Sequence, residues 1–277
     1  MIANFFWKGT LTNYQLASML SFKKNGFDVI LWSPDSHDVE KYGIQLKNSE
    51  DVIPLSVMDK VTQVSFFDNN KSGTYEKLAC YSDIFRLKLL KQHEGIWSDC
   101  DVFCLKPVEE WVNLYNQSGD VFSGEMVLDN RNFCNTAVLG FRNKKAIEEI
   151  DSMVEKLIET KSQTYWGEVG PAQIDAYVRT NQVKLLDEHI FYPVPQNQWE
   201  KSFSTNPDDV NFCLTRSKDS FCIHWWNDAL DHNGIKVLPE KNSYLGQLIS
   251  TVINYVDKQK VSKKVALLKS HKERFKR

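Results

Sequence analysis

The first 35 residues alternate between apolar and polar segments in a way that predicts a strand, a helix and a second strand. The apolar run 2–7 ends at a Lys-Gly-Thr turn, and residues 11–24 carry apolar side chains at roughly helical spacing. A second apolar run, 27–32, is closed by Ser-Pro-Asp. A strand–helix–strand unit of this length joins parallel neighbours, so we expect an α/β fold whose sheet begins parallel.

The same alternation continues through the remaining chain. Helical spacing of apolar residues predicts helices over residues 74–93, 144–161, 170–180, 243–256 and 259–275. Short apolar runs predict strands over residues 96–98, 102–105, 121–125, 133–141 and 221–226, with an extended segment at 191–195. Residues 35–72 are polar and irregular. We expect one large α/β domain over residues 1–240 and a helical, basic C-terminal segment over residues 241–277.

The composition narrows the class of protein without identifying it. The 277 residues are 42% hydrophobic, which is enough for a sizeable core, and a net charge of -2 argues against a polycation that coats nucleic acid. Six scattered cysteines form no CxxC pair and predict reduced core thiols. We find neither a signal sequence nor a run of about 20 apolar residues, so we expect a cytoplasmic protein without a membrane span.

Two carboxylates, Asp99 and Asp101, follow the predicted strand 96–98. On a continuous strand they would point to opposite faces, so they converge on one ion only if the strand breaks into a turn. A divalent cation such as Mn²⁺ or Mg²⁺ prefers oxygen ligands and keeps positions open for phosphates. An Asp-x-Asp sequence is also common by chance, so the alternative is a solvated turn.

Asp83 and Arg86 lie three residues apart on the preceding predicted helix and therefore share a face. One interpretation is a surface ion pair that contributes about 0.3 kcal/mol. The other is a sugar site, in which the carboxylate accepts hydroxyls and the guanidinium steadies an oxygen-rich donor.

Three segments in this part of the chain, 81–87, 95–102 and 106–107, together resemble a known family. The Ser-Asp-x-x-Arg helix, the Gly-x-x-x-Asp-x-Asp turn and the following Lys-Pro resemble the DXD-containing sugar-binding region of retaining glycosyltransferases. That group includes yeast-type initiating mannosyltransferases, α-1,4-galactosyltransferases and bacterial capsule or lipopolysaccharide enzymes. The resemblance implies a GT-A fold, with a Rossmann-like, mostly parallel sheet flanked by helices.

The resemblance also implies an activity. It is a metal-dependent transfer of a hexose-type sugar from a nucleoside diphosphate donor, with a UDP-sugar favoured, to a glycan or lipid-linked glycan acceptor. The resemblance further implies retention of anomeric configuration and a role in bacterial surface polysaccharide synthesis. The alternatives are a nucleotide-sugar hydrolase or binding protein on the same fold, and an unrelated metal-dependent phosphohydrolase. The sequence shows no second acidic cluster for the two-metal site that many phosphohydrolases use.

Roles in donor binding follow from the resemblance. The backbone near Phe6 and Trp7 receives the nucleobase, and Asp83 with Arg86 grips the donor sugar. Asn135 resembles a residue that borders the sugar pocket.

Roles in metal binding follow in the same way. Asp99 and Asp101 hold Mn²⁺ or Mg²⁺; Asp101 binds it directly, and Asp99 also faces ribose or sugar. His224 adds a nitrogen ligand or a hydrogen bond to the diphosphate. Trp225 and Trp226 either cover the nucleotide or pack in the core.

Two further features are open to two interpretations each. Glu125 and Asp129 lie near the expected acceptor side and are either catalytic helpers or surface residues. The segment 257–277 carries nine lysines and arginines against two acidic residues. It either lies as an amphipathic helix on an anionic membrane at its cytoplasmic face, or is a solvated helix end.

Overall fold

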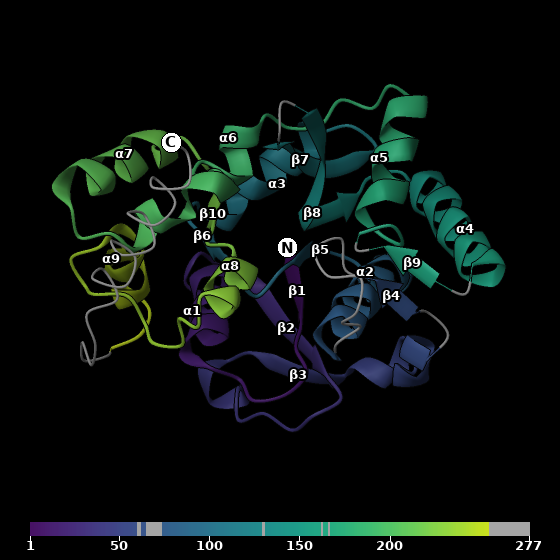
Figure 1. The fold of residues 1–277 in the computed structure, drawn as a ribbon, viewed down its shortest axis with the longest axis horizontal. Coiled ribbons are helices and arrows are strands. Elements are labelled where there is room, and N and C mark those ends of the chain that lie inside the picture. Colours follow the sequence, from purple (N-terminus) through teal and green to yellow (C-terminus); the bar gives the residue numbers. More distant parts are fainter. Residues whose placement is uncertain (60–61, 65–73, 129–130, 162, 166, 255–277) are drawn as a thin grey trace.

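The computed structural model describes the chain except residues 60–61, 65–73, 129–130, 162, 166 and 255–277. Its central sheet has the strand order β3-β2-β1-β5-β8-β7 (Figure 1). These strands are β1 (Ile2–Phe6), β2 (Asp28–Ser33), β3 (Gln45–Asn48), β5 (Ile96–Ser98), β7 (Val121–Leu128) and β8 (Arg131–Phe141). Strands β3, β2, β1 and β5 pair in parallel, whereas β8 is antiparallel to β5 and β7. The sheet is therefore mostly parallel near the N-terminus, as predicted.

Two smaller sheets flank the central one. Strand β6 (Val102–Cys104) pairs antiparallel with β10 (Cys222–His224), and β4 (Thr62–Val64) pairs parallel with β9 (Gln163–Tyr165). Because β6 leaves the central sheet directly after β5, the chain turns between them. That break is the one expected for the Asp-Cys-Asp triplet.

Helices cover both faces of the central sheet. The α-helices are α1 (Asn13–Lys24), α2 (Thr74–Gln92), α3 (Val108–Gln117), α4 (Lys144–Thr160), α5 (Pro171–Thr180), α6 (Glu188–Phe191), α7 (Pro207–Ser217), α8 (Asn227–His232) and α9 (Tyr244–Ser250). The 3₁₀ helices are η1 (Glu40–Tyr42), η2 (Ser49–Asp51), η3 (Leu55–Asp59) and η4 (Gln196–Phe203). Figure 1 shows α1 on one side of β1 and β2, and α2 with α4 on the other.

Alternation along β1 assigns its side chains to two hydrophobic cores. Phe5 packs against Phe22 of α1, with ring centroids 5.3 Å apart. Its neighbour Phe6 faces the other way and packs against Phe85 of α2 at 5.1 Å. Successive strand side chains point to opposite faces, so an aromatic run with no polar alternation requires helices on both sides of the sheet.

Several predicted elements differ from the structure. The predicted last strand, 221–226, ends at His224, and Phe191 of the predicted extended segment belongs to α6. The helix predicted over 243–256 is shorter, because α9 ends at Ser250. The second predicted helix, 259–275, and the basic segment 257–277 lie outside the described residues.

Some elements were not predicted at all, among them β3, α3 and α7. Strand β3 has the sequence Gln-Leu-Lys-Asn and lies at the edge of the sheet, where none of its residues is fully buried. Its sequence therefore lacks the apolar run that predicts a strand. Within the described residues, no helix is both long and apolar enough to cross a bilayer.

Candidate active site

The turn between β5 and β6 holds the Asp-Cys-Asp triplet at the carboxyl edge of the parallel strands. The amide of Asp99 donates a hydrogen bond to the carbonyl of Ala137 on β8, at 2.8 Å. The buried thiol of Cys100 lies 3.3 Å from the carbonyl of Phe6, at the end of β1. Cys100 therefore anchors the turn to β1.

The ribbon of β6 and β10 brings His224 beside Asp101. His224 lies opposite Val102 in the register, and its Nε2 is 2.9 Å from Asp101 Oδ2. The same oxygen accepts the amide N–H of Asn227 at 2.8 Å. Burial opposes ionisation of Asp101, but the His224 ring and the Asn227 amide outweigh it, so the pKa of Asp101 is lowered. The carboxylate is therefore ionised at neutral pH, as a cation ligand must be.

Asp99, Asp101 and His224 form a cluster able to hold a metal ion. Each offers one ligand atom, and these atoms all lie within 4.8 Å of one another. His224 Nδ1 is buried and has no hydrogen-bond partner among the described residues. Two carboxylate oxygens and an imidazole nitrogen suit a divalent cation such as Mn²⁺ or Mg²⁺. The structure thus brings together the three residues expected to bind metal, although His224 comes from a different segment than the two acids.

The guanidinium of Arg86 lies buried between two acids. Its Nη2 is 3.2 Å from Asp83 Oδ1 and 3.3 Å from Asp99 Oδ1. Its Nη1 donates to the carbonyl and to the hydroxyl oxygen of Thr136, at 2.7 Å each. Its Nε and Nη2 also donate to the carbonyl and hydroxyl oxygens of Ser82. The interpretation of Asp83 and Arg86 as a surface ion pair is therefore wrong, because both side chains are buried.

These contacts change the role expected of Arg86. A guanidinium has five N–H donors, and the protein acceptors around Arg86 are sufficient to engage all of them. The geometry favours a positioning role, in which Arg86 neutralises Asp83 and Asp99 and fixes their places.

Asp83 lies against the start of α5. A Cβ atom on Gly170, the residue before this helix, would lie 2.6 Å from the Cβ of Asp83, so only glycine fits there. Burial raises the pKa of Asp83 to about 6, with Arg86 lowering it and Asp99 raising it further. Asp83 is thus placed to exchange hydrogen bonds as either a carboxylate or a carboxylic acid near neutral pH.

The raised pKa of Asp83 predicts a pH-dependent stability. Between pH 3.8 and about 6 the native state holds a proton on Asp83 that the unfolded state has lost. Stability therefore falls as pH rises through this window, and Asp83→Asn should remove that part of the fall. Urea unfolding of both proteins at several pH values would measure it. A constant difference between them from pH 4 to pH 7 would contradict the assignment.

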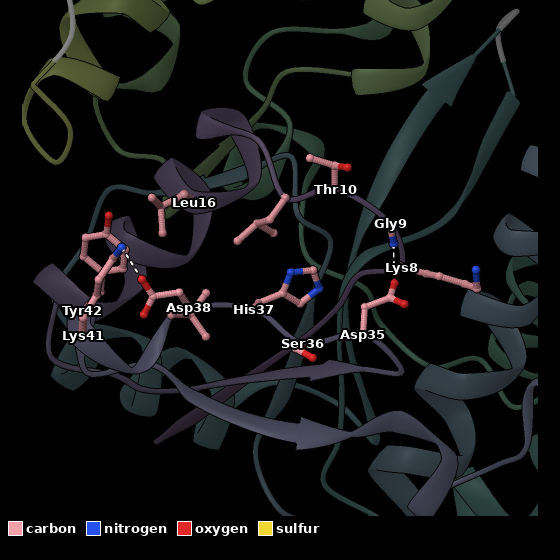
Figure 2. Close-up of a pocket in the computed structure, with 12 residues that line it drawn as sticks. Lys8, Gly9, Thr10, Leu16, Asp35, Ser36, His37, Asp38, Lys41 and Tyr42 are labelled. Atoms are coloured by element: carbon pink, nitrogen blue, oxygen red, sulfur yellow. Dashed lines mark hydrogen bonds and ion pairs between the residues drawn. The ribbon is translucent and has the colours of Figure 1, made fainter.

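A cavity of about 640 Å³ opens beside the same edge of the sheet (Figure 2). It is lined by residues 8–11 after β1, by Leu16 of α1, and by residues 35–39 and 41–42 after β2. The Gly9 amide donates to Asp35 Oδ2 at 2.6 Å, which links the two loops. His37 Nε2 lies 3.0 Å from the hydroxyl of Ser33, and Figure 2 shows the ring directed between the loops.

The cavity introduces site residues that sequence reasoning missed. Asp35 and His37 follow the second strand of the parallel unit, and the carboxyl ends of such strands commonly line ligand sites. Their place directly after this strand was the feature of the sequence that could have identified them as candidates. Of the residues expected to receive a nucleobase, Phe6 is buried, and Trp7 is half-buried and donates its indole N–H to the carbonyl of Thr10.

The two tryptophans after β10 are buried, and Trp226 packs against His224. Trp225 is fully buried and packs 6.0 Å from the ring of Tyr14. Trp226 lies 4.1 Å from the His224 ring and donates its indole N–H to the carbonyl of Val194. Its backbone has φ 60, an uncommon conformation for a bulky residue. Of the two interpretations left open for these tryptophans, core packing fits both.

The remaining predicted residues lie on β7 and β8. Glu125 is half-buried and accepts a hydrogen bond from Asn132, and Asn135 accepts one from the amide of Ala137. Asp129 lies outside the described residues. A catalytic role for Glu125 stays a prediction.

Two protein-family profiles match the chain. Residues 11–118 match the family described as "Glycosyltransferase sugar-binding region containing DXD motif". Residues 144–252 match "Alpha 1,4-glycosyltransferase conserved region". The first match contains the Asp-Cys-Asp turn, and the second contains β10 with His224.

Individual relatives are distant. Lactosylceramide 4-alpha-galactosyltransferase of Mus musculus is 26% identical over 54% of this chain and 42% of its own length. Alpha-1,4-N-acetylglucosaminyltransferase of Homo sapiens is 20% identical over 65% of this chain and 51% of its own. The chain thus spans about half, or less, of these relatives.

A solved structure has a similar fold. The apo structure of the WbbM bifunctional glycosyltransferase aligns with 95% of this chain and 50% of its own, with a TM-score of 0.50 and 10% identity. At this identity the likeness concerns the fold alone, which is the GT-A type expected from the sequence.

Proposed function

We propose that this chain, a glycosyltransferase of the family with a DXD-containing sugar-binding region, moves a hexose-type sugar from a nucleoside diphosphate donor, a UDP-sugar, to a glycan acceptor. The observation that carries the proposal is the cluster of Asp99, Asp101 and His224. It lies at the same sheet edge as a cavity whose volume suits a nucleoside.

A divalent cation is part of the proposal. Asp99, Asp101 and His224 would hold Mn²⁺ or Mg²⁺, which would offset the charge that develops on the leaving diphosphate. The ionised state of Asp101 and the mixed oxygen and nitrogen donor set support this role.

The chain's own residues would bind and orient the donor. The cavity between residues 8–11 and 35–42 would take the nucleoside, with Asp35 and His37 as polar partners. Asp83 would bind sugar hydroxyls, because it is held by Arg86 beside Asp99 and abuts Gly170. A buried carboxyl with a fixed position can select a hydroxyl arrangement.

Further details rest on the sequence resemblance alone. They are retention of configuration and a bacterial surface polysaccharide, such as capsule or lipopolysaccharide, as the acceptor, free or lipid-linked. Contact of residues 257–277 with the inner face of the membrane rests on their basic composition.

A thermal-shift panel of UDP- and GDP-sugars, each with and without Mn²⁺, tests the donor class. A ligand at 100 times its dissociation constant stabilises the native state by about 2.7 kcal/mol. For a domain of this size we expect a shift of roughly 5 °C with one nucleotide sugar, only in the presence of the metal. No metal-dependent shift with any donor would contradict the proposal.

Acceptor dependence separates transfer from simple hydrolysis or binding. Turnover of the donor identified by the panel should rise when acceptor glycans are added. Turnover that no glycan accelerates, with release of free sugar, would instead indicate a nucleotide-sugar hydrolase.

A further inference from the structure

Trp97 contacts Asp99 from within the central sheet. The two residues are separated by one position, so side chains on an extended strand leave the same face. The indole N–H of Trp97 donates to Asp99 Oδ1 at 2.7 Å. The indole is 1% exposed, and the Arg86 guanidinium lies 4.9 Å from its ring centre. Trp97 is thus a rigid donor that the surrounding core holds in place.

Among the described residues, partners contact only one oxygen of the Asp99 carboxylate. Trp97 Nε1 and Arg86 Nη2 both contact Oδ1, at 2.7 and 3.3 Å. No hydrogen bond or ion pair joins Oδ2 to another residue in the described part of the chain. The Asp99 side chain is 28% exposed, and one of its carboxylate oxygens belongs to the metal cluster.

Of the two partners, Trp97 makes the more specific contact. Arg86 Nη2 is shared among Asp83, Asp99 and Ser82, so it holds the two acids side by side, but its contact with Asp99 is divided and longer than that of Trp97. The Trp97 N–H has one acceptor and a shorter distance. A group that hydrogen-bonds to the atom of a ligand that does not bind the metal orients the ligand and raises its affinity for the ion.

We propose that Trp97 is a positioning residue of the metal site, which holds Oδ1 of Asp99 and thereby presents Oδ2 to the cation. The inference rests on the proposed metal-dependent function, and it adds to the site a residue that stands at an unspecified position of the Gly-x-x-x-Asp-x-Asp motif and outside the ligand cluster. It predicts that the indole N–H, and not merely the bulk of the ring, contributes to metal affinity.

Trp97→Phe separates these two contributions, because phenylalanine keeps an aromatic ring under Arg86 and removes the N–H. We expect the dissociation constant for Mn²⁺ to rise about 10-fold. Isothermal titration of the protein with Mn²⁺ alone measures it without any donor or turnover. Trp111→Phe is the matched control, since Trp111 is also fully buried but packs in the core on the other face of the sheet. Its Mn²⁺ affinity should match that of the wild type.

A double-mutant cycle distinguishes positioning from general loosening of the core. If Trp97 acts through Asp99, then Trp97→Phe should add nothing to the loss of Mn²⁺ affinity caused by Asp99→Asn. Additive losses in the double variant would overturn the inference.

The outcomes also separate this inference from the proposed function. If the wild type binds no Mn²⁺, the metal assignment fails and this inference fails with it. If the wild type binds Mn²⁺ through Asp101, and Trp97→Phe binds it equally well, only the inference fails.

Should Trp97→Phe not fold, the indole ¹H–¹⁵N spectrum provides a second test. Asp99→Asn should shift one indole resonance of the eight tryptophans strongly. An unchanged indole spectrum would overturn the link between Trp97 and Asp99.

Discussion

Asp101→Asn is expected to lower metal-dependent donor turnover by at least about 100-fold, because losing a charged ligand removes several kcal/mol of transition-state stabilisation. Asparagine keeps the shape of the side chain and an oxygen that can accept from the Asn227 amide. The fold should therefore survive. Initial rates over a Mn²⁺ titration, together with circular dichroism, measure both quantities.

A matched variant controls for the loss of one negative charge. Asp28 is exposed at the start of β2, at the end of the strand opposite the site, and Asp28→Asn should leave turnover unchanged. Undiminished turnover in Asp101→Asn would contradict the metal assignment, whatever the control shows.

Arg86→Ala is expected to reduce the free energy of unfolding by about 3 to 5 kcal/mol, since it leaves buried acids without their cation. Asp83 and Asp99 both lose their ion-pair partner, and the two oxygens of Thr136 lose their donor. Urea unfolding measured at neutral pH gives the difference directly.

Two further variants define the origin of this loss. Arg86→Lys keeps the charge but cannot supply five donors, so we expect an intermediate stability. Arg179→Ala removes an arginine that is 61% exposed and paired with Asp175, and should cost no more than about 1 kcal/mol. If Arg86→Ala cost no more than Arg179→Ala, the buried ion pairs would not stabilise the fold.

Amphipathic patterns predicted some elements well and others not at all. Helix α4 matched its prediction within one residue because five apolar positions recur along one face, and α5 begins at Pro171, one residue after the predicted start. Helix α7 was missed although its start carries local signals, which are the Asn206 cap, Pro207 and two acids in the first turn. It buries few side chains, so it lacks the apolar stripe on which the prediction relied, and its packing against α9 and η4 is visible only in the tertiary structure.

The part of the candidate site that consists of short sequence motifs was predictable from the sequence. The Asp-x-Asp turn and the Ser-Asp-x-x-Arg helix appear in short segments, so the sequence identified Asp83, Arg86, Asp99 and Asp101. It did not identify Asp35 or His37, because polar residues in a loop are common and only the cavity gives them significance.

By itself, then, the sequence determined the α/β order of the chain, the break after β5 and the acids proposed to carry the chemistry, because each depends on residues close together along the chain. The tertiary structure decided which of them meet. The pairing of β6 with β10 places His224 against Asp101, and the packing of α2 on the sheet buries Arg86 between two acids. Of the two interpretations of Asp83 and Arg86, packing excluded the surface pair and placed both residues in a buried charge network, since burial is a property of the assembled layers and not of any one segment.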